Sequence, residues 1–404
     1  MVGARVALSA YTTLGLGGPA GRFVAAGDDE QIITAVRQAD RAGEAVLVLG
    51  GGSNLVVADE GFPGTVIQVA SRGISVVDAA PGGDGETHAH GEAVLVTVAA
   101  GELWDRLVAW SVAEGLAGLE CLSGIPGLAG ATPIQNVGAY GQDVAETITE
   151  VRALDRERDE VIRLGRADCE FGYRTSMLKR AAAGLATGRF VVLSVTFRLW
   201  RAEAGPDVAS GAAGAEAASS GSAGRGLGLS RPVKYAELAR RLGVEVGGRV
   251  PLAQARSAVL ALRRGKGMVL EAGDPDTRSA GSFFTNPIVS AAQFEELRRR
   301  AAERLGPQTP VPHFPADEAP PDGGPAEGAV KVPAAWLIER AGFTKGYPAG
   351  GAARISTKHT LALTNPGDGT TADLLALARE IRAGVRAQFG INLSNEPVLV
   401  GVTL

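Results

Sequence analysis

Two glycine-rich stretches contain the residue types that bind phosphate groups and a planar ring. The first, LGGGSNL at 49–55, directly follows a buried apolar run. Successive backbone N–H groups in a tight glycine turn form an anion-binding nest, to which the serine and asparagine add short polar side chains. The second, GIPGLAGATPIQNVGAYG at 124–141, has five glycines and two prolines in 18 residues, too many for a core element. Its Gln135 and Asn136 can hydrogen-bond to the edge of a planar heterocycle. The alternative interpretation is that both stretches are tight turns between strands.

Other nucleotide and metal motifs are absent or lack their structural context. No GxxxxGK[ST] occurs, which excludes a P-loop NTPase. The segment GLGGPA at 15–20 satisfies a loose GxGxxA pattern. However, Pro19 and a strand-like run at 22–26 stand where a dinucleotide-binding fingerprint needs a helix N-terminus. His88 and His90 lie in a polar turn with no cysteine or further histidine nearby, so we expect solvated loop residues and no metal site.

The composition is that of an ordinary globular enzyme. The chain has 404 residues, 45% hydrophobic and 21% charged, which is enough for two or three domains. A net charge of −4 provides no basic field for nucleic acid. Cys121 and Cys169 cannot make a disulfide framework or a zinc site, which favours a reducing cytoplasm. The apolar stretch at 6–10 is too short for a secretory signal, and no window approaches the roughly 18–20 apolar residues that cross a bilayer. We therefore expect a soluble, cytoplasmic protein without a membrane partner.

Short helices and strands are expected to position the two glycine-rich stretches. A helix begins after Asp28 and stops at Gly43, and the strand at 45–50 leads into the first stretch. Further apolar runs predict strands at 65–69, 93–100, 151–154 and 190–199, and a helix at 103–114. Because short strands outnumber long βαβ crossovers, the pattern favours an α+β fold.

Two compositional interruptions divide the chain. Residues 203–230 are almost entirely Gly, Ala and Ser, and 307–328 form a Pro/Gly-rich acidic loop. We therefore predict a first domain at 1–201, a flexible linker or insert at 202–231, and a second α/β domain at 232–404. The second domain is expected to contain helices at 235–242, 252–264, 291–305, 333–341 and 371–389, and strands at 360–364 and 397–404.

Six motifs lie in one order along both halves of the chain. They are GGGSNLVV at 50–57, GLECLSGIPGLAGATPIQNVGAYGQ at 118–142, FGYRTS at 171–176, AGSFFTNP at 280–287, AWLI at 335–338 and NEP at 395–397. With these motifs in this order, the chain resembles the UDP-N-acetylenolpyruvoylglucosamine reductase family. The resemblance runs from about residue 12 to the C-terminus, interrupted only by the insert and the acidic loop.

The resemblance implies an FAD-binding domain of the vanillyl-alcohol-oxidase type, in which two glycine loops hold the FAD pyrophosphate. A family-specific α/β substrate domain follows, and its final segment, 394–404, returns toward the active site. The residues implied in FAD binding are Gly50, Gly51, Gly52, Ser53, Asn54, Gly124, Ile125, Pro126, Gly127, Gly130, Ala131, Pro133, Gln135, Asn136, Gly138, Ala139 and Tyr140.

The resemblance also implies a reaction: NADPH-dependent reduction of UDP-N-acetylglucosamine enolpyruvate to UDP-N-acetylmuramate, in peptidoglycan precursor synthesis. NADPH is expected to enter the same pocket as the sugar nucleotide, reduce FAD and leave before the substrate binds. The lack of a separate Rossmann motif agrees with this ping-pong scheme.

Three residues carried over from the motifs suit this chemistry. Hydride addition to the terminal enolpyruvyl carbon leaves negative charge on the adjacent carbon and the carboxylate. Arg174 stays charged and can hold the carboxylate through two hydrogen bonds. Ser282 stays protonated at neutral pH and can give its proton to the carbon. Glu396, if burial raises its pKa, can hydrogen-bond to the developing dianion. The alternative roles are a surface ion-pair arginine, a turn serine and an exposed loop acid.

The resemblance assigns three further residues to the substrate. Tyr235 and Lys266 are expected to reach the diphosphate, and Asn286 the uracil. The family usually has lysine before this asparagine, whereas this chain has Thr285, so a phosphate contact there is not expected. Cys121 is interpreted as an inert buried thiol.

We expect the reductase to be a monomer. Two other functions remain open. An FAD oxidase of the same fold would use oxygen as acceptor. A non-catalytic flavin or UDP-sugar binding module would have lost one of Arg174, Ser282 and Glu396, whereas all three are present.

Overall fold

The computed structural model describes residues 6–79, 92–182, 186–203, 228–316, 319–320 and 326–404. The chain forms two compact units, and each is assembled from separate stretches of sequence. Unit 1 comprises Met1–Phe23, Gly52–Thr65 and Lys266–Leu404, and unit 2 comprises Val24–Gly51 and Val66–Gly265.

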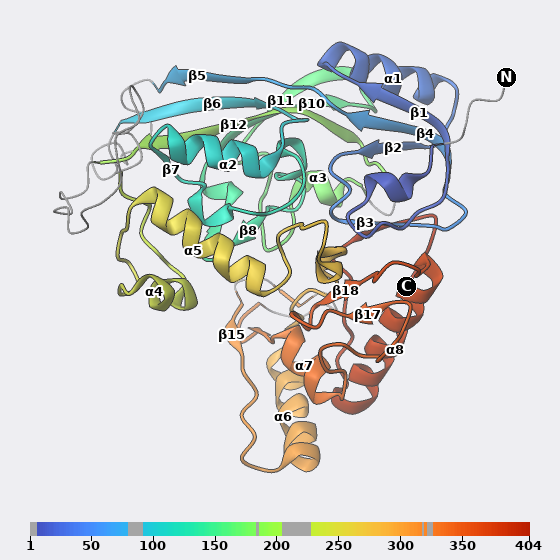
Figure 1. The fold of residues 1–404 in the computed structure, drawn as a ribbon, viewed down its shortest axis with the longest axis vertical. Helices are drawn as coiled ribbons and strands as arrows, with labels where there is room; N and C mark the ends of the chain where they lie inside the picture. The colour runs from blue at the N-terminus through green and yellow to red at the C-terminus, as the bar shows by residue number, and fades with distance from the viewer. Residues whose placement is uncertain (1–5, 80–91, 183–185, 204–227, 317–318, 321–325) are drawn as a thin grey trace. The chain divides into compact units, whose positions relative to one another are not determined.

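A six-stranded antiparallel sheet forms the centre of unit 2 (Figure 1). The strands lie in the order β11-β10-β12-β6-β5, and β7 pairs with the end of β12. Their bounds are β5 (Ile74–Asp78), β6 (Ala93–Ala99), β7 (Leu116–Ala117), β10 (Ile148–Asp155), β11 (Glu160–Gly165) and β12 (Phe190–Arg201). Side chains of β6 alternate between buried and partly exposed, as expected for a strand with one face on the core.

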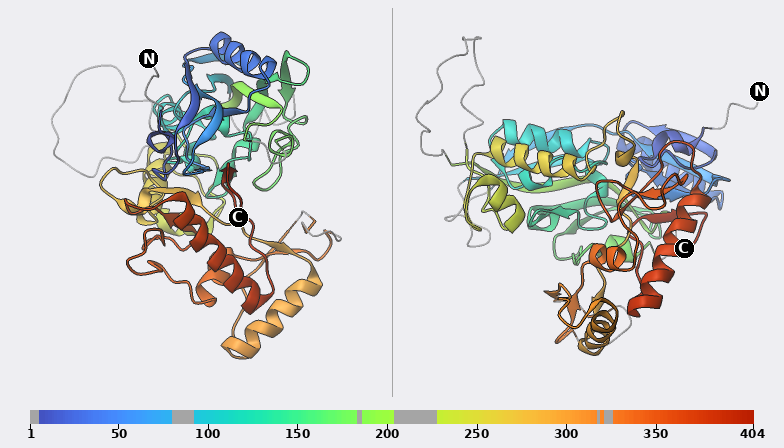
Figure 2. Two further views of the ribbon diagram at one scale, coloured as in Figure 1. Left: turned by 90° about the vertical axis from the view of Figure 1, so that its right-hand side faces the viewer. Right: turned by 60° about the horizontal axis from the view of Figure 1, so that its bottom comes forward.

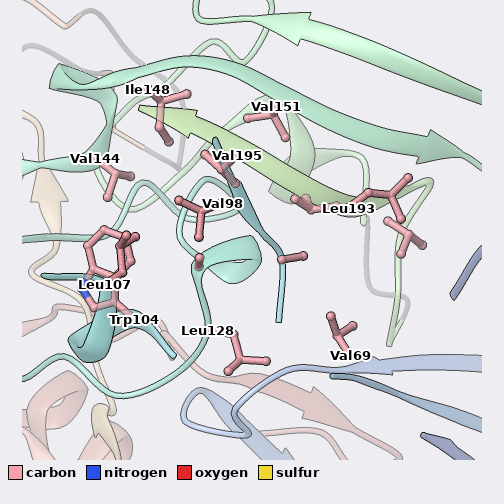
Figure 3. Packing of buried hydrophobic residues seen from close by; sticks show 14 of the residues in the cluster. Val69, Val98, Trp104, Leu107, Leu128, Val144, Ile148, Val151, Leu193 and Val195 are labelled. Atoms are coloured by element: carbon pink, nitrogen blue, oxygen red, sulfur yellow. The ribbon is translucent and has the colours of Figure 1, made fainter. Parts of the chain in front are cut away.

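Helix α2 (Trp104–Ala113) packs its buried face into the core of unit 2. Figure 3 shows Trp104 and Leu107 among the valines of the sheet. The ring centroid of Trp104 lies 5.9 Å from that of Phe197, and its indole N–H donates to the Leu122 carbonyl at 3.0 Å. This core contact therefore fixes the backbone just before the second glycine-rich stretch.

A smaller sheet has the order β1-β4-β2, formed by β1 (Ala20–Ala26), β4 (Phe62–Val69) and β2 (Val46–Leu49). The border between the units falls within β1 and β4. Helix α1 (Asp29–Arg41) precedes β2 and begins and ends as expected. The Asp28 side chain accepts a hydrogen bond from the Gln31 amide, and Gly43 follows the helix with a φ of +66°.

The remaining elements of unit 2 are α3 (Met177–Arg180), α4 (Ala236–Leu242), α5 (Leu252–Gly265), β8 (Gly138–Ala139) and β9 (Gln142–Asp143). Val233, Leu238 and Val259 from the α4–α5 region bury apolar side chains with Cys121. This cluster explains why residues up to Gly265 belong to unit 2, although the expected domain boundary lies at 232.

In its described residues, unit 1 combines small sheets with three α-helices (Figure 2). The sheets have the orders β13-β18-β17 and β14-β16-β15, and β3 pairs with β19 in parallel. The strands are β3 (Leu55–Val57), β13 (Ser279–Ser282), β14 (Ile288–Val289), β15 (Phe314–Pro315), β16 (Val330–Lys331), β17 (Arg354–Ile355), β18 (Ala362–Thr364) and β19 (Val398–Val400). The helices are α6 (Ala291–Leu305), α7 (Ala334–Arg340) and α8 (Thr371–Phe389). Capping boxes start α6 and α8, and both helices pack on a common core with α7.

The predicted elements are confirmed, with differences at their ends. The last strand is limited to β19, and Pro333 is the N-cap of α7 and lies one residue before the helix. Strands β3, β5, β7–β9, β11 and β13–β17 were not expected, because runs of two to six residues carry too little periodicity. The acidic loop includes the short strand β15, which pairs with β16.

Two expected loops fall largely outside the described residues. The polar turn with His88 and His90 lies there, as does the insert at 204–227. The described chain resumes at 228, and Ser230 is fully buried with its amide donating to the Val250 carbonyl at 2.7 Å. The end of the predicted 202–231 segment is therefore part of unit 2.

Both cysteines are buried and unpaired with each other. Burial, with a smaller effect of Glu120, raises the pKa of Cys121, and burial with the nearby Asp168 raises the pKa of Cys169 to about 11. Both therefore stay protonated thiols at neutral pH. Among the described residues, no group of three or more His, Cys, Asp and Glu could hold a metal, and no helix is long and apolar enough to cross a membrane.

Candidate active site

The two glycine-rich stretches meet in unit 2 with no room for side chains. A Cβ added to Gly51 would lie 2.6 Å from the Cα of Gly127. A Cβ added to Gly130 would overlap Ala100, which follows β6. Gly124 and Gly127 also have φ values of +72° and +113°, which other residues rarely adopt. Glycine is therefore required where the two loops touch.

Polar contacts hold the second loop to the core of unit 2. The Gly130 amide donates to the Ala100 carbonyl at 2.9 Å, and the Trp104 amide donates to the Gly127 carbonyl at 3.1 Å. Asp105, in the first turn of α2, accepts from the Gly124 amide at 2.6 Å and from both terminal nitrogens of Arg256 on α5, at 2.6 and 2.9 Å. Burial raises the pKa of Asp105, but Arg256 and the Gly124 amide outweigh it and hold this pKa below its usual value.

The loop backbone suits a phosphate group. Among the described residues, the amides of Gly51 and Gly127 make no hydrogen bond, although both glycines are partly buried and adjoin each other. Adjacent backbone N–H groups without protein partners form a nest for an anion. The bare glycine surface also allows a pyrophosphate to approach the backbone closely. The cradle therefore fits a dinucleotide cofactor.

Arg174 lies in a β-turn close to the second loop. The turn spans 172–175, and Arg174 has a φ of +54°. Its guanidinium carbon is 5.8 Å from the centroid of the Tyr173 ring. Three of the five non-glycine residues with positive φ in the described chain, Asn136, Tyr140 and Arg174, are predicted site residues. Such strain commonly marks functional positions.

Asn136 links the second loop to this turn. Its side-chain N–H donates to the Gly172 carbonyl at 3.1 Å, and its Oδ1 accepts from the Ala145 amide at 3.1 Å. Sequence reasoning assigned this side chain to the edge of the cofactor ring. In the structure its amide group is hydrogen-bonded to backbone on both sides, so Asn136 organises the loop, and its contact with the cofactor stays a prediction.

Tyr235 stands beside the second loop on the segment that enters α4. Its ring meets the Tyr140 ring edge-on, with centroids 5.7 Å apart, and 44% of its surface is exposed. The fully buried Glu120 holds the start of this segment: its Oε1 accepts from the Arg231 amide and its Oε2 from the Gly118 amide, both at 2.6 Å. Glu120 therefore ties the second loop to the chain that leads to Tyr235.

Arg263 adds a buried cation to this region. It is 7% exposed, and its charge interacts with Tyr140, Asp105 and Arg174. Burial lowers the pKa of Arg263 to about 10, so the guanidinium remains charged at neutral pH. It raises the local positive potential around Arg174.

In unit 1, Ser282 and Glu396 are carried by neighbouring backbone segments. Ser282 ends β13, and the Glu396 amide donates to the Phe283 carbonyl at 2.9 Å. An isolated bridge between Phe284 and Asn395 extends this pairing. Both side chains are intermediate in exposure. The structure thus brings these two predicted residues together.

The first glycine loop continues into unit 1 and adjoins the same segments. The Thr13 amide donates to the Gly52 carbonyl at 3.1 Å, and its hydroxyl donates to the Ser279 carbonyl of β13 at 2.6 Å. The Val398 amide donates to the Asn54 carbonyl at 2.9 Å. Thr13 therefore joins the loop to β13, and Asn54 hydrogen-bonds directly to β19, the strand that follows Glu396.

Lys266 and Asn286 also lie in unit 1, half-buried. The Oδ1 of Asn286 accepts from the amide of Ala334, the first residue of α7, at 2.9 Å. Its side-chain N–H₂ is the group left for a ligand. Arg174 and Tyr235 belong to unit 2, whereas Ser282, Glu396, Lys266 and Asn286 belong to unit 1.

Comparison with known proteins decides the family. Residues 20–165 match the family described as FAD binding domain, and residues 274–400 match the C-terminal domain of UDP-N-acetylenolpyruvoylglucosamine reductase. The UDP-N-acetylenolpyruvoylglucosamine reductase of Thermobifida fusca is 54% identical over 99% of this chain and 98% of its own. This chain belongs to that family.

Two further comparisons agree with this assignment. The Streptomyces coelicolor reductase is 52% identical over 98% of this chain and 90% of its own. A crystal structure of the Thermus caldophilus reductase matches with a TM-score of 0.55 and 23% identity, covering 98% of both chains, and it shows the shared fold. The predicted α+β fold, with an FAD-binding domain and a family-specific C-terminal domain, is confirmed. The chain is an FAD-dependent oxidoreductase, and the glycine cradle is the part of unit 2 that suits its cofactor.

Sequence reasoning did not identify Asp105, Glu120 or Arg263. Asp105 and Arg263 each lie in an amphipathic helix, where a charged side chain usually faces the solvent. Glu120 lies within the motif at 118–142. Its apolar neighbours, two leucines and a cysteine, were a detectable sign of a buried carboxylate. The roles of the predicted site residues remain predictions.

Proposed function

We propose that this chain reduces the enolpyruvyl ether of UDP-N-acetylglucosamine enolpyruvate to the lactyl ether, giving UDP-N-acetylmuramate, with NADPH as reductant. The observation that carries the proposal is the full-length similarity to reductases of this name together with retention of Arg174, Ser282 and Glu396. When bound, FAD supplies the hydride that the substrate receives.

Arg174 holds the enolpyruvyl carboxylate. Hydride addition to the terminal carbon pushes the double-bond electrons toward the adjacent carbon and the carboxylate. A guanidinium that stays charged strengthens its hydrogen bonds as this charge grows, so it stabilises the transition state more than the ground state. The buried Arg263 supports this from the same unit. The strained turn of Arg174 supports a functional placement of this residue.

Ser282 supplies the proton that completes the reduction. Its hydroxyl transfers a proton to the carbon next to the carboxylate, so the double bond gains one hydride and one proton. A serine does not lose its proton at neutral pH, which prevents premature transfer. Glu396, on the segment paired with residue 283, hydrogen-bonds to the developing dianion when protonated.

The sugar nucleotide is held through its diphosphate and base. Tyr235 and Lys266 contact the diphosphate, and Asn286 contacts the uracil through its remaining N–H₂ group. The exposure of Tyr235 and the edge contact of its ring with Tyr140 support this assignment. NADPH binds first and leaves before the sugar nucleotide enters. The enzyme is a monomer in the cytoplasm, and its product is used in peptidoglycan synthesis.

An anaerobic experiment that separates the two half-reactions tests the function. Purified enzyme should lose its yellow colour with NADPH and regain it with the enolpyruvyl sugar under argon. The variant Ser282→Ala should reduce normally with NADPH and reoxidise at least about 100-fold more slowly. Reduced enzyme that reoxidises only with oxygen would contradict the function, and equal damage to both half-reactions would remove Ser282 as proton donor.

A further inference from the structure

The turn that carries Arg174 adopts a backbone conformation that arginine disfavours. Arg174 is the third residue of the turn 172–175, where the Thr175 amide donates to the Gly172 carbonyl at 3.3 Å. A positive φ at this position favours glycine or asparagine and costs other residues about 1–2 kcal/mol. Contacts around the turn must therefore hold it.

The side chain of Lys179 contacts the peptide group of Arg174 directly. Its Nζ donates to the Arg174 carbonyl at 3.0 Å. Lys179 belongs to α3, and Ser176 caps this helix by accepting from the Lys179 amide at 3.3 Å. The ammonium group is thus fixed over the turn by the helix that follows it, and a charged donor makes a stronger hydrogen bond than a neutral one.

Two more hydrogen bonds connect the turn to the FAD loop. Asn136 donates to the Gly172 carbonyl at 3.1 Å, and the Ser176 hydroxyl donates to the Ile134 carbonyl at 2.5 Å. These bonds hold both ends of the turn, while Lys179 holds the peptide that sets the direction of the Arg174 side chain. Without Lys179, the φ of Arg174 can return to a negative value, which redirects its Cα–Cβ bond.

We propose that Lys179 is a positioning residue that holds Arg174 in its left-handed conformation and so keeps the guanidinium on the substrate carboxylate. This inference rests on the proposed function, because that function assigns the carboxylate to Arg174. In this role the ammonium group acts on the Arg174 carbonyl, and its effect on the reaction passes through Arg174.

A double-mutant cycle tests this route with the full-length, FAD-loaded enzyme. Lys179→Met should slow flavin reoxidation by the enolpyruvyl sugar about 10- to 100-fold, since a misplacement of about 1 Å has effects of that size. Reduction by NADPH should change less than about twofold. In an Arg174→Ala background, the same lysine substitution should add less than about twofold. Calorimetric binding of UDP-N-acetylmuramate to the oxidised enzyme provides a second readout: about tenfold weaker with Lys179→Met alone, and unchanged by it in the Arg174→Ala background.

Arg180→Met is the matched control. Arg180 is the next residue of α3, is exposed, and pairs with Glu170. Its substitution therefore also removes one cation from this helix. Both readouts should stay within about twofold of wild type. Lys179→Arg, which retains a charged donor, should recover most of the lost rate. If Lys179→Met fails to fold, Ser176→Ala loosens the same turn and takes its place in the cycle.

The outcomes separate the two proposals. An equal loss from Lys179→Met in both backgrounds, or no loss in either, would overturn the positioning role. If Arg174→Ala reoxidises normally, the assignment of the carboxylate to Arg174 fails instead. A loss seen with Lys179→Met that vanishes without Arg174 supports both.

Discussion

At the scale of single residues, hydrogen-bonded acidic side chains organise the backbone in and around the loops that suit FAD. Glu120 accepts two backbone amides at 2.6 Å while fully buried, and Asp105 joins the Gly124 amide to Arg256. A buried carboxylate is stable only when hydrogen bonds replace the water it has lost. Both acids therefore act on the loop backbone, and their side chains are not free to take part in the chemistry.

Asp105→Asn should destabilise the protein in a pH-dependent way. The folded state lowers the pKa of Asp105, so its carboxylate contributes stability above the unfolded-state pKa of about 4 and loses it as the pH falls further. At neutral pH we expect a loss of about 1–2 kcal/mol in unfolding free energy, after allowance for a carboxylate that is 40% exposed. Urea unfolding over a pH series measures it.

The difference between wild type and Asp105→Asn should shrink below about pH 4. Asp159→Asn is the control, because Asp159 also pairs with an arginine, Arg37, but is more exposed than Asp105. We expect its unfolding free energy to change by no more than about 0.5 kcal/mol. A difference that stays constant with pH would show that the charge of Asp105 does not contribute.

At the scale of elements, two short loops and one turn depend on close backbone approach. The strand β2 delivers Gly51 directly against Gly127, and α2 holds the second loop through Trp104 and Asp105. Neither loop has regular secondary structure at the point of contact. The rigidity of the cradle therefore comes from the sheet and helix on which the loops end.

Gly51→Ala should disrupt the cradle. Its Cβ would lie 2.6 Å from the Cα of Gly127, and backbone atoms cannot move aside as a flexible side chain can. We expect FAD to bind at least about tenfold more weakly, measured by fluorescence titration of the apoprotein. Gly273→Ala is the control, because an added Cβ there meets nothing within 4 Å. Equal FAD affinity in the two variants would count against a tight Gly51–Gly127 contact at the cofactor.

At the scale of the whole molecule, the chain forms two units, and each is built from stretches that are not contiguous in the sequence. Residues 52–65 belong to unit 1, although they lie between parts of unit 2. The first glycine loop is therefore shared by both units along the covalent chain.

Removal of FAD should lower the stability of the molecule. A ligand present at 100 times its Kd stabilises the folded state by about 2.7 kcal/mol. The apoprotein should unfold at a lower temperature than the holoprotein, and restored FAD should reverse the change. Hydrogen exchange should increase at 50–52 and 124–131, while the amides of β12 remain protected. Identical melting curves for the two forms would contradict a cradle that binds FAD in these loops.

The chemical inventory and most elements could be read along the chain, because their signals are local. The Asp28 cap, the apolar strand before Gly50 and the glycines that need positive φ each depend on neighbouring residues. The motif order further indicated the family, and the matches to the family models and to reductases of 52–54% identity confirmed it. Sequence spacing could not show that Lys179 holds Arg174, that Glu120 holds Arg231 or that Gly51 meets Gly127. These contacts depend on how segments that are distant in the sequence pack together. Packing depends on the shape of the whole core, and no single stretch of sequence specifies that shape.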